Sequence, residues 1–213
     1  VVRPDVTGWL YADGWVLEVA VTSSPVIGAL KRCAPFQFGL TAPYPFWQST
    51  VQQSVHLSGV QPLFRFPWNV SRAYRFGQRV ATKYANVKNS GQTEAPMRII
   101  IDALGAADTP RIENMQTGEF LLLEKSLAEG ERIIINITHS GTTVTSSADG
   151  DCRGALTLES NLYRLHRGDN ILKPSASSGL ENLDITVEFS PRAAGSTAVP
   201  GDISEIICRM MAK

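Results

Sequence analysis

The stretch APMRIIIDALGAADTPRIENMQTGEFLLLEKSLAEGERIIINI, residues 95–137, decides the fold of this chain. It breaks into short apolar runs, such as residues 97–101, separated by residues typical of turns, such as 116–119. Further along, residues 183–189 alternate apolar and polar side chains with a period of two. This period turns one face of a strand inward and the other outward, and short strands at regular spacing indicate a sandwich or a jelly roll. We therefore predict an antiparallel β-sandwich with almost no helix over residues 96–189.

Short motifs follow one another in a set order through this stretch and its flanks. They are Ala42-Pro43-x-Pro45-Phe46-Trp47, Asn89-Ser90-Gly91, Ala95-Pro96-x-Arg98-Ile99-Ile100-Ile101, Pro110-x-Ile112-x-Asn114-x-x-Thr117-Gly118, Leu127-x-x-Gly130-Glu131 and Tyr163-x-Leu165-x-x-Gly168-x-Asn170-x-Leu172. In this order they resemble the siphophage distal tail protein family, most of them its C-terminal domain. The resemblance implies a galectin-like, jelly-roll β-sandwich attached to a ring-forming β domain in a virion or prophage tail.

The same resemblance implies a structural role. The chain would assemble with itself into a ring, a hexamer for the full-length protein, that acts as an adaptor or hub between the tail tube and the tail tip or baseplate. The implied partners are the tail tube, the tape-measure protein and the tail-tip or receptor-binding proteins, and no cofactor is implied. The protein would be located in the virion tail after assembly in the bacterial cytoplasm. A second hypothesis is a carbohydrate-binding module that contacts glycans of the host cell surface.

The chain has 213 residues, which is enough for one large or two small domains. We predict an all-β protein and place residues 1–83 in the ring-forming, or belt, domain. We expect this domain to be incomplete, because the chain opens on Val1 and not on a methionine. Residues 84–192 form the predicted sandwich, and residues 193–213 are a C-terminal extension.

Composition and charge exclude several classes of protein. The hydrophobic content of 43% supports a sizeable core, and the 20 basic and 20 acidic residues cancel. A nucleic-acid-binding protein normally carries a basic excess, so nucleic acid is not an expected partner. No apolar run approaches the ~20 residues of a membrane span. The three cysteines, Cys33, Cys152 and Cys208, lie far apart without C-x-x-C spacing, which favours reduced thiols over a zinc site or a disulfide framework.

Aromatic residues gather in the first part of the chain. Residues 9–11 and 15–21 flank Asp13-Gly14, which is a strong hairpin signal. All four tryptophans precede residue 84, and a small β domain can bury only some of them, so the remainder should form an apolar interface patch. The candidate interface residues are Trp9, Trp15, Phe46, Trp47 and Trp68. The alternative is a core position for Trp9 and Trp15, and a structural corner that buries Phe46 and Trp47.

A sugar site on the sandwich would need an exposed aromatic platform. Between residues 96 and 192 the aromatic residues are Phe120, Tyr163 and Phe189. Phe120 and Phe189 lie on the apolar side of their alternations and are predicted to be in the core. Tyr163 is therefore the candidate glycan contact.

Catalytic motifs are absent from the sequence. It contains no G-x-S-x-G elbow, no Walker loop and no G-x-G-x-x-G, and the histidines lie in separate segments: His56, His139 and His166. Two acidic pairs are weighed as sites. Asp149 and Asp151 would either ligate a cation or simply form a turn, and Glu113 and Glu119 would either act as a glycosidase pair or lie on solvent-facing sides of strands. We predict no catalytic residue, no cofactor-binding residue, no metal ligand and no enzymatic activity.

Overall fold

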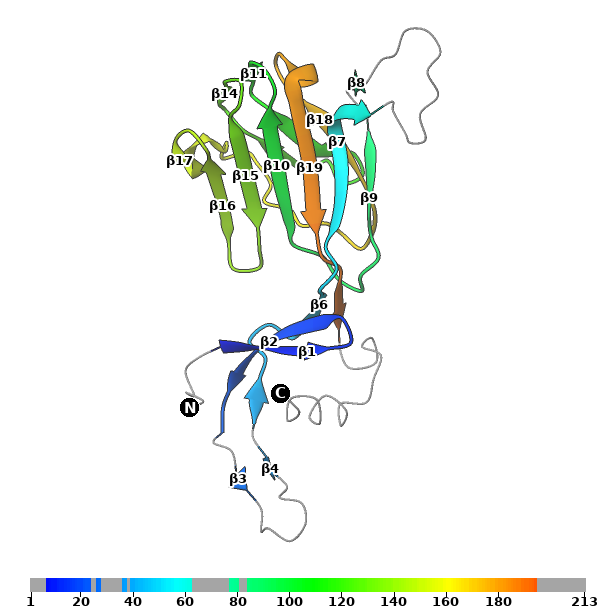
Figure 1. Ribbon diagram of the computed structural model, residues 1–213, viewed down its shortest axis with the longest axis vertical. Helices are drawn as coiled ribbons and strands as arrows, with labels where there is room; N and C mark the ends of the chain where they lie inside the picture. The colour runs from blue at the N-terminus through cyan, green and yellow to red at the C-terminus, as the bar shows by residue number, and fades with distance from the viewer. Residues whose placement is uncertain are drawn as a thin grey trace, which may run out of the picture. The chain divides into compact units, whose positions relative to one another are not determined.

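The computed structural model describes residues 7–23, 26–27, 36–37, 39–62, 77–80 and 84–194. These residues form β-strands, loops and two short 3₁₀ helices, η1 (Arg153–Ala155) and η2 (Leu180–Asn182) (Figure 1). The chain divides into two compact units. The first unit consists of Val1–Val51 and Pro191–Lys213, and the second of Gln52–Ser190. The second unit is therefore inserted between two parts of the first.

Two antiparallel sheets lie face to face in the second unit and form a β-sandwich (Figure 1). The larger sheet has the order β17 (Gly150–Asp151), β16 (Thr142–Ser146), β15 (Arg132–Ile137), β10 (Met97–Ala103), β19 (Leu183–Phe189), β7 (Gln53–Pro62) and β8 (Gly77–Val80). The smaller sheet has the order β13 (Phe120–Leu122), β12 (Arg111–Asn114), β18 (Gly168–Ser175) and β9 (Ala85–Asn89). A further short pair joins β11 (Ala107–Asp108) to β14 (Ser126–Leu127).

The core between the sheets follows from the alternation in the sequence. On β19 the apolar residues at alternate positions from Leu183 to Phe189 are at most 3% exposed, while the residues between them are half-buried on the outer face. β10 shows the same alternation and pairs with both β15 and β19, so that Ile99 lies beside Ile135 and Val187. Burial of one such aliphatic side chain contributes about 1.5–3 kcal/mol. The predicted sandwich over residues 96–189 is confirmed.

The predicted domain boundary at residue 83 is wrong, because β7 belongs to the sandwich. β7 pairs with β19 from Gln53, opposite Phe189, to Ser58, opposite Ile185. The register shifts within this ladder, and consecutive residues Leu57 and Ser58 are both buried, with the Ser58 hydroxyl donating to the carbonyl of Leu183 at 3.0 Å. This break in the two-residue period makes the strand resemble a polar segment with no clear inner face.

The chain returns to the first unit earlier than predicted. β20 (Arg192–Ala194) pairs with β6 (Phe46–Ser49) and not with a strand of the sandwich, so the sandwich ends at Ser190. The first unit contains a sheet of order β1 (Thr7–Ala12), β2 (Trp15–Val21), β6 and β20, with β5 (Leu40–Thr41) also paired to β2. β3 (Val26–Ile27) and β4 (Phe36–Gln37) form a separate pair.

The Asp-Gly hairpin predicted in the first unit is confirmed. β1 and β2 pair from Thr7, opposite Ala20, to Ala12, opposite Trp15. The two turn residues adopt positive φ angles, 43° at Asp13 and 82° at Gly14, as a two-residue hairpin turn requires.

The sandwich depends on one glycine for a close backbone contact. Gly179, at a φ of 71° before η2, would carry a Cβ only 2.3 Å from the carbonyl oxygen of Ala106. Gly118 has a similar φ of 75° and open space around it. We expect Gly179→Ala to lower the free energy of unfolding by about 3 kcal/mol, from strain and overpacking together, and Gly118→Ala by about 1 kcal/mol from strain alone. Urea denaturation of the two variants tests this, and equal losses would contradict the contact.

Candidate functional site

β1 presents two aromatic side chains to solvent at the edge of its sheet. Trp9 is 59% exposed and Tyr11 is 63% exposed, and they lie two residues apart on the same outer face. Leu10 and Ala12 point to the opposite face, where Ala12 is buried. Among the described strands, β1 has a neighbour on one side only, which is β2. We call Trp9, Tyr11 and the open backbone edge of β1 the β1 surface.

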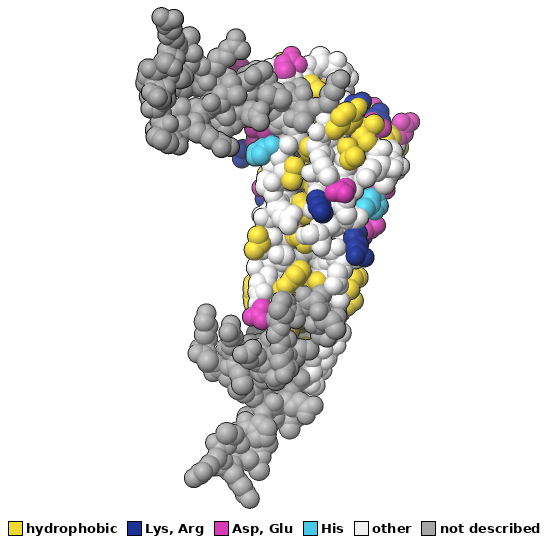
Figure 2. Space-filling model, turned by 90° about the vertical axis from the view of Figure 1, so that its right-hand side faces the viewer, with side chains coloured by type: hydrophobic (Ala, Val, Ile, Leu, Met, Phe, Trp, Pro, Cys, Tyr) yellow, Lys and Arg dark blue, Asp and Glu magenta, His cyan; other side chains and the backbone are white. Residues whose placement is uncertain are grey.

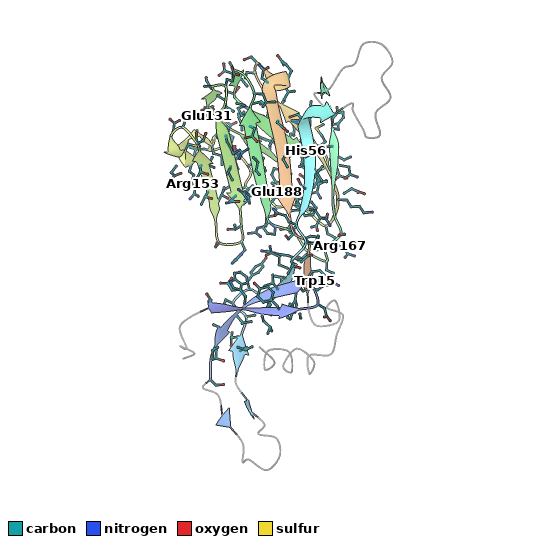
Figure 3. All side chains as sticks on the ribbon, in the orientation of Figure 1. Trp15, His56, Glu131, Arg153, Arg167 and Glu188 are labelled. Carbon is teal, nitrogen blue, oxygen red and sulfur yellow. The ribbon has the colours of Figure 1, made fainter. Side chains whose placement is uncertain are left out.

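The other predicted interface residues are placed differently. Trp47 is 9% exposed and forms a small core with Ala12 and Ala193, so its prediction as an interface residue is wrong and the alternative of a buried position applies to it. Trp15, labelled in Figure 3, is half-buried and packs against that core. Phe46 is half-buried, with its ring centroid 4.9 Å from that of Tyr44. Trp68 lies outside the described residues.

Sequence reasoning missed Tyr11 as a member of the exposed surface. The signal was present, because Tyr11 is two residues from Trp9 in a predicted hairpin strand and must share its face. Trp47 was misplaced because the sequence alone does not reveal that β20, from the far end of the chain, covers it with Ala193.

The prediction that Tyr163 is available to stack on a sugar is also wrong. Its side chain is 4% exposed within the core of the sandwich, and this burial raises the pKa of the Tyr163 phenol above its ordinary range. Phe120, predicted in the core, lies instead half-exposed on the outer face, with the Arg111 guanidinium 4.2 Å from its ring centroid. The inward residue of β13 is Leu121, so the alternation was read one residue out of phase. Phe189 is buried as predicted.

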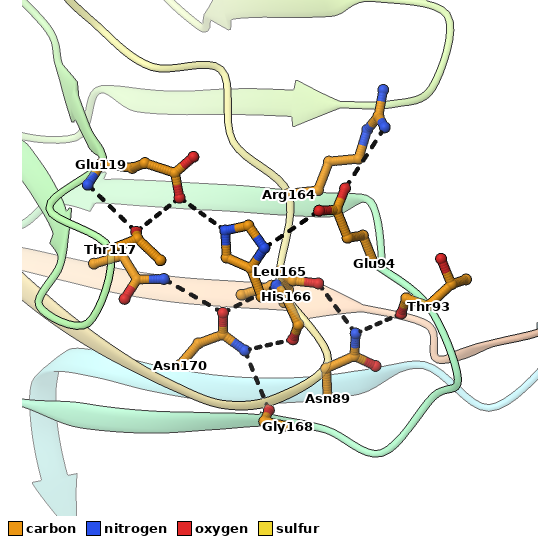
Figure 4. Close-up of polar contacts among 11 residues, drawn as sticks. Asn89, Thr93, Glu94, Thr117, Glu119, Arg164, Leu165, His166, Gly168 and Asn170 are labelled. Atoms are coloured by element: carbon orange, nitrogen blue, oxygen red, sulfur yellow. Dashed lines mark hydrogen bonds and ion pairs between the residues drawn. The ribbon is translucent and has the colours of Figure 1, made fainter.

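The motif asparagines fix the loops at one end of the sandwich (Figure 4). Asn170 is fully buried, and its side-chain nitrogen donates to the carbonyl oxygens of His166 at 2.8 Å, Val87 at 3.2 Å and Gly168 at 3.2 Å. Its side-chain oxygen accepts the backbone N–H of His166 at 3.0 Å. A single side chain therefore satisfies backbone groups on β9 and on the segment that leads into β18.

Asn89 and Asn114 act in the same way. The Asn89 side chain donates to the carbonyl oxygens of Thr93 at 2.9 Å and Leu165 at 3.1 Å, and accepts the N–H of Gly91 at 3.0 Å. The Asn114 oxygen accepts the N–H of Gln116 at 3.0 Å. Buried backbone groups of irregular loops need such partners, which explains why asparagine occupies these motif positions.

Removal of the Asn170 side chain should destabilise the sandwich. We expect Asn170→Ala to lower the free energy of unfolding by about 2–4 kcal/mol, because several buried backbone groups lose their partner. Asn86→Ala is the matched control, since Asn86 is exposed and its side chain donates to the exposed Asp169 side chain at 2.9 Å. That control should change stability by about 0.5 kcal/mol or less. The midpoints of chemical denaturation of the two variants test this prediction. The same midpoint for both would refute the structural role of Asn170.

A cluster of charged groups surrounds His166 at this end. His166 Nε2 lies 2.8 Å from the Glu119 carboxylate, and Nδ1 lies 3.3 Å from the Glu94 carboxylate. The hydrogen bond to Glu119 raises the pKa of His166 against the opposing effect of its partial burial. Burial acts to raise the pKa of Glu119, but hydrogen bonds from His166 and Thr117 outweigh it, so this pKa lies below its ordinary value.

A second ionic cluster lies around Glu131, labelled in Figure 3. Glu131 is 7% exposed, accepts the Ser146 hydroxyl at 2.5 Å and lies 3.0 Å from the ammonium of Lys125. Asp149 lies 2.6 Å from the same ammonium. Hydrogen bonds to Asp149 and Glu131 raise the pKa of Lys125. Asp149 is thus bound to a cationic side chain and Asp151 caps the N–H of Arg153 at 3.1 Å, which favours the turn interpretation of this pair.

Glu113 and Glu119, the two carboxylates considered as a glycosidase pair, also interact with neighbouring side chains. Glu113 lies 3.2 Å from Arg111, and Glu119 bonds His166 and Thr117. On the outer face of the larger sheet, His56 Nδ1 is 3.0 Å from the hydroxyl of Thr186 (Figure 3). Among the described residues, no group of three or more His, Cys, Asp or Glu side chains is placed to hold a metal ion. Cys152 is a free cysteine, while Cys33 and Cys208 lie outside the described residues.

The surface of the sandwich carries mixed charge. On the side drawn in Figure 2, acidic, basic and histidine side chains are interspersed with hydrophobic ones, without a continuous basic stripe on the described surface. Such a surface agrees with the net charge of zero and gives no support to a nucleic-acid site. The described part of the chain also contains no helix of the length and apolarity that a membrane span requires.

Comparison with known proteins assigns a part of the chain to a family. Residues 90–192 match the model of the siphovirus-type tail component, C-terminal domain. This part of the chain belongs to that family, and the predicted resemblance to distal tail proteins is confirmed. None of the curated proteins matches the chain.

Two solved structures are similar to the chain. The first is the crystal structure of SPP1 Dit (gp 19.1), described as a paradigm of hub adsorption apparatus in Gram-positive infecting phages. The similarity covers 90% of this chain and 67% of that chain, with a TM-score of 0.66 and 11% sequence identity. The second is a chain of the phage P2 baseplate in its activated conformation with Ca, with 83% and 64% covered, a TM-score of 0.46 and 10% identity. The match to SPP1 Dit supports the predicted all-β fold.

Proposed function

We propose that the protein is a ring-forming hub of the distal tail, and that the β1 surface joins one subunit to the next. The observation that carries this proposal is the pair of exposed aromatic side chains, Trp9 and Tyr11, on an edge strand. Aromatic residues are enriched among the anchors of protein interfaces. An open edge strand is an aggregation hazard unless another chain or element covers it.

A closed ring removes this hazard in every subunit at once. In a ring each subunit contributes two different surfaces, so the edge of one β1 is covered by a surface of the next subunit, and no edge is left over. A hexamer is the proposed number of subunits. The ring would connect the tail tube, with the tape-measure protein, to the tail-tip or receptor-binding proteins, after assembly in the bacterial cytoplasm.

The proposal is tested by the oligomeric state of the chain and of the double variant Trp9→Ala/Tyr11→Ala. We expect sedimentation velocity over a concentration series to show an assembly of the unchanged chain. An interface anchor contributes about 2 kcal/mol or more, which corresponds to about thirty-fold in the dissociation constant. The double variant should therefore assemble at least that much more weakly.

The matched control is Tyr84→Ala, which removes an exposed aromatic side chain from the sandwich. Tyr84 is 49% exposed and lies just before β9. This variant should assemble like the unchanged chain. A chain that stays monomeric at high concentration, or a double variant that assembles normally, would refute the role of the β1 surface.

We further propose that the protein has no hydrolase activity. Glu113 is paired with Arg111 and Glu119 with His166. These pairings support the proposal, because a carboxylate held by a cationic neighbour is a poor general acid or base for a substrate. Purified protein incubated with cell-wall polysaccharide should release no reducing sugar. Release that disappears in Glu119→Gln or Glu113→Gln would overturn this proposal.

A further inference from the structure

Three loops meet at the end of the sandwich where the chain enters and leaves it. Gln53, Met97 and Phe189 are neighbours across β7, β10 and β19, and they mark this entry end. Glu94 lies in the loop between β9 and β10, just before Met97. Glu119 lies in the connection between β12 and β13, and His166 precedes β18. Three segments that are distant in the sequence therefore bring one histidine and two carboxylates together (Figure 4).

Each ring nitrogen of His166 faces a carboxylate oxygen. Nε2 faces Glu119 at 2.8 Å and Nδ1 faces Glu94 at 3.3 Å. A neutral imidazole carries one N–H, so one of the two carboxylates would then face a nitrogen lone pair. The imidazolium form carries two N–H groups, so it makes a charge-assisted hydrogen bond with Glu119 and an ion pair with Glu94.

The position of the histidine is set by the buried interior. The backbone N–H of His166 donates to Asn170, and its carbonyl accepts from Asn170, so the fully buried asparagine holds the residue on both sides. Leu165 forms two backbone hydrogen bonds with Ala95, the residue after Glu94, at 2.9 and 3.0 Å. On the other side, the Glu119 carboxylate also accepts the Thr117 hydroxyl at 2.7 Å. These hydrogen bonds fix the positions of His166 and Glu119, unlike a surface ion pair between two long flexible side chains.

We propose that a protonated His166 ties the three loops of the entry end together, and that the tie is released when the imidazole loses its proton. Only a charged His166 attracts both Glu94, in the β9–β10 loop, and Glu119, in the β12–β13 connection. Deprotonation frees one carboxylate and removes the attraction between the segments.

Several other charged or titratable groups surround the cluster and contribute to its electrostatic interactions. Arg164 lies 3.9 Å from Glu94 and can hold that carboxylate when His166 is neutral. The carboxylates of Glu119 and Glu113 both act electrostatically on the buried Tyr163. The remaining groups on the adjoining strand and segment are Lys88, Arg167 and Asp169.

The direction of the pH effect follows from the two shifts. The pKa of His166 is raised above 6.5, so its stabilising contribution is complete below that value and is lost as the pH rises through the raised pKa. The pKa of Glu119 is lowered from 4.5, so its contribution is present above that value and is lost as the pH falls through the lowered pKa. The tie is therefore strongest between pH 4.5 and pH 6.5.

An NMR titration of the histidine ring signals tests the proposal directly. We expect the pKa of His166 to lie above the value of a histidine in the unfolded chain. Glu119→Gln should lower the His166 pKa more than Glu94→Gln does, because the Glu119 hydrogen bond is the larger cause of the shift. A His166 pKa at or below the unfolded value, or one that neither variant changes, would overturn the proposal.

Hydrogen exchange and unfolding at several pH values give a second readout. Corrected for the intrinsic pH dependence of exchange, the N–H groups of Ala95 and His166 should become less protected above the His166 pKa. The stability difference between the unchanged chain and His166→Gln should shrink over the same range. His56→Gln, on the outer face of the larger sheet, is the control and should leave the protection of the Ala95 and His166 N–H groups unchanged. Protection that does not vary with pH would contradict a proton-dependent tie.

Discussion

The burial of alternate side chains on β10 is the constraint on which the sandwich depends. β10 lies between β15 and β19, so its backbone is paired on both sides and its inner face must match two registers at once. Ile99 and Ile101 are at most 1% exposed, and a slip of one residue would turn them toward solvent. β7 extends this sheet on the far side of β19, which is why the sandwich includes residues from before and after the predicted boundary.

Polar side chains help to hold the ends of the sandwich. At the entry end Asn89, Asn114 and Asn170 replace regular strand pairing with side-chain hydrogen bonds to loop backbone. At the Glu131 site, Lys125 holds two carboxylates that come from different segments of the chain. Residues that look like generic turn signals in the sequence are therefore structural, because each one satisfies backbone groups or charges that burial would otherwise leave without a partner.

Local patterns in the sequence predicted what depends on local structure, namely the all-β class, the alternation on β19 and the Asp13-Gly14 hairpin. They failed where a distant segment decides the outcome. Trp47 is covered by Ala193 from the far end of the chain, and β7 was hidden by the break in period at Leu57 and Ser58. Tyr163 follows a loop with no alternation to place it, and its burial depends on the packing of both sheets. The contact of His166 with Glu94 and Glu119 joins three segments, so no spacing rule identifies it.

The insertion of the sandwich into the first unit sets an order of events during synthesis. β6 is made early, but its neighbour β20 emerges only after all of the sandwich has been made. A long flexible segment between β6 and β20 would oppose their pairing through its loop-closure entropy. The folded sandwich removes most of that entropy, because the strands on which the chain enters and leaves pair with each other at Gln53 and Phe189. Completion of the first sheet thus requires that the sandwich has folded, and a nascent or misfolded chain lacks the pairing of β6 with β20.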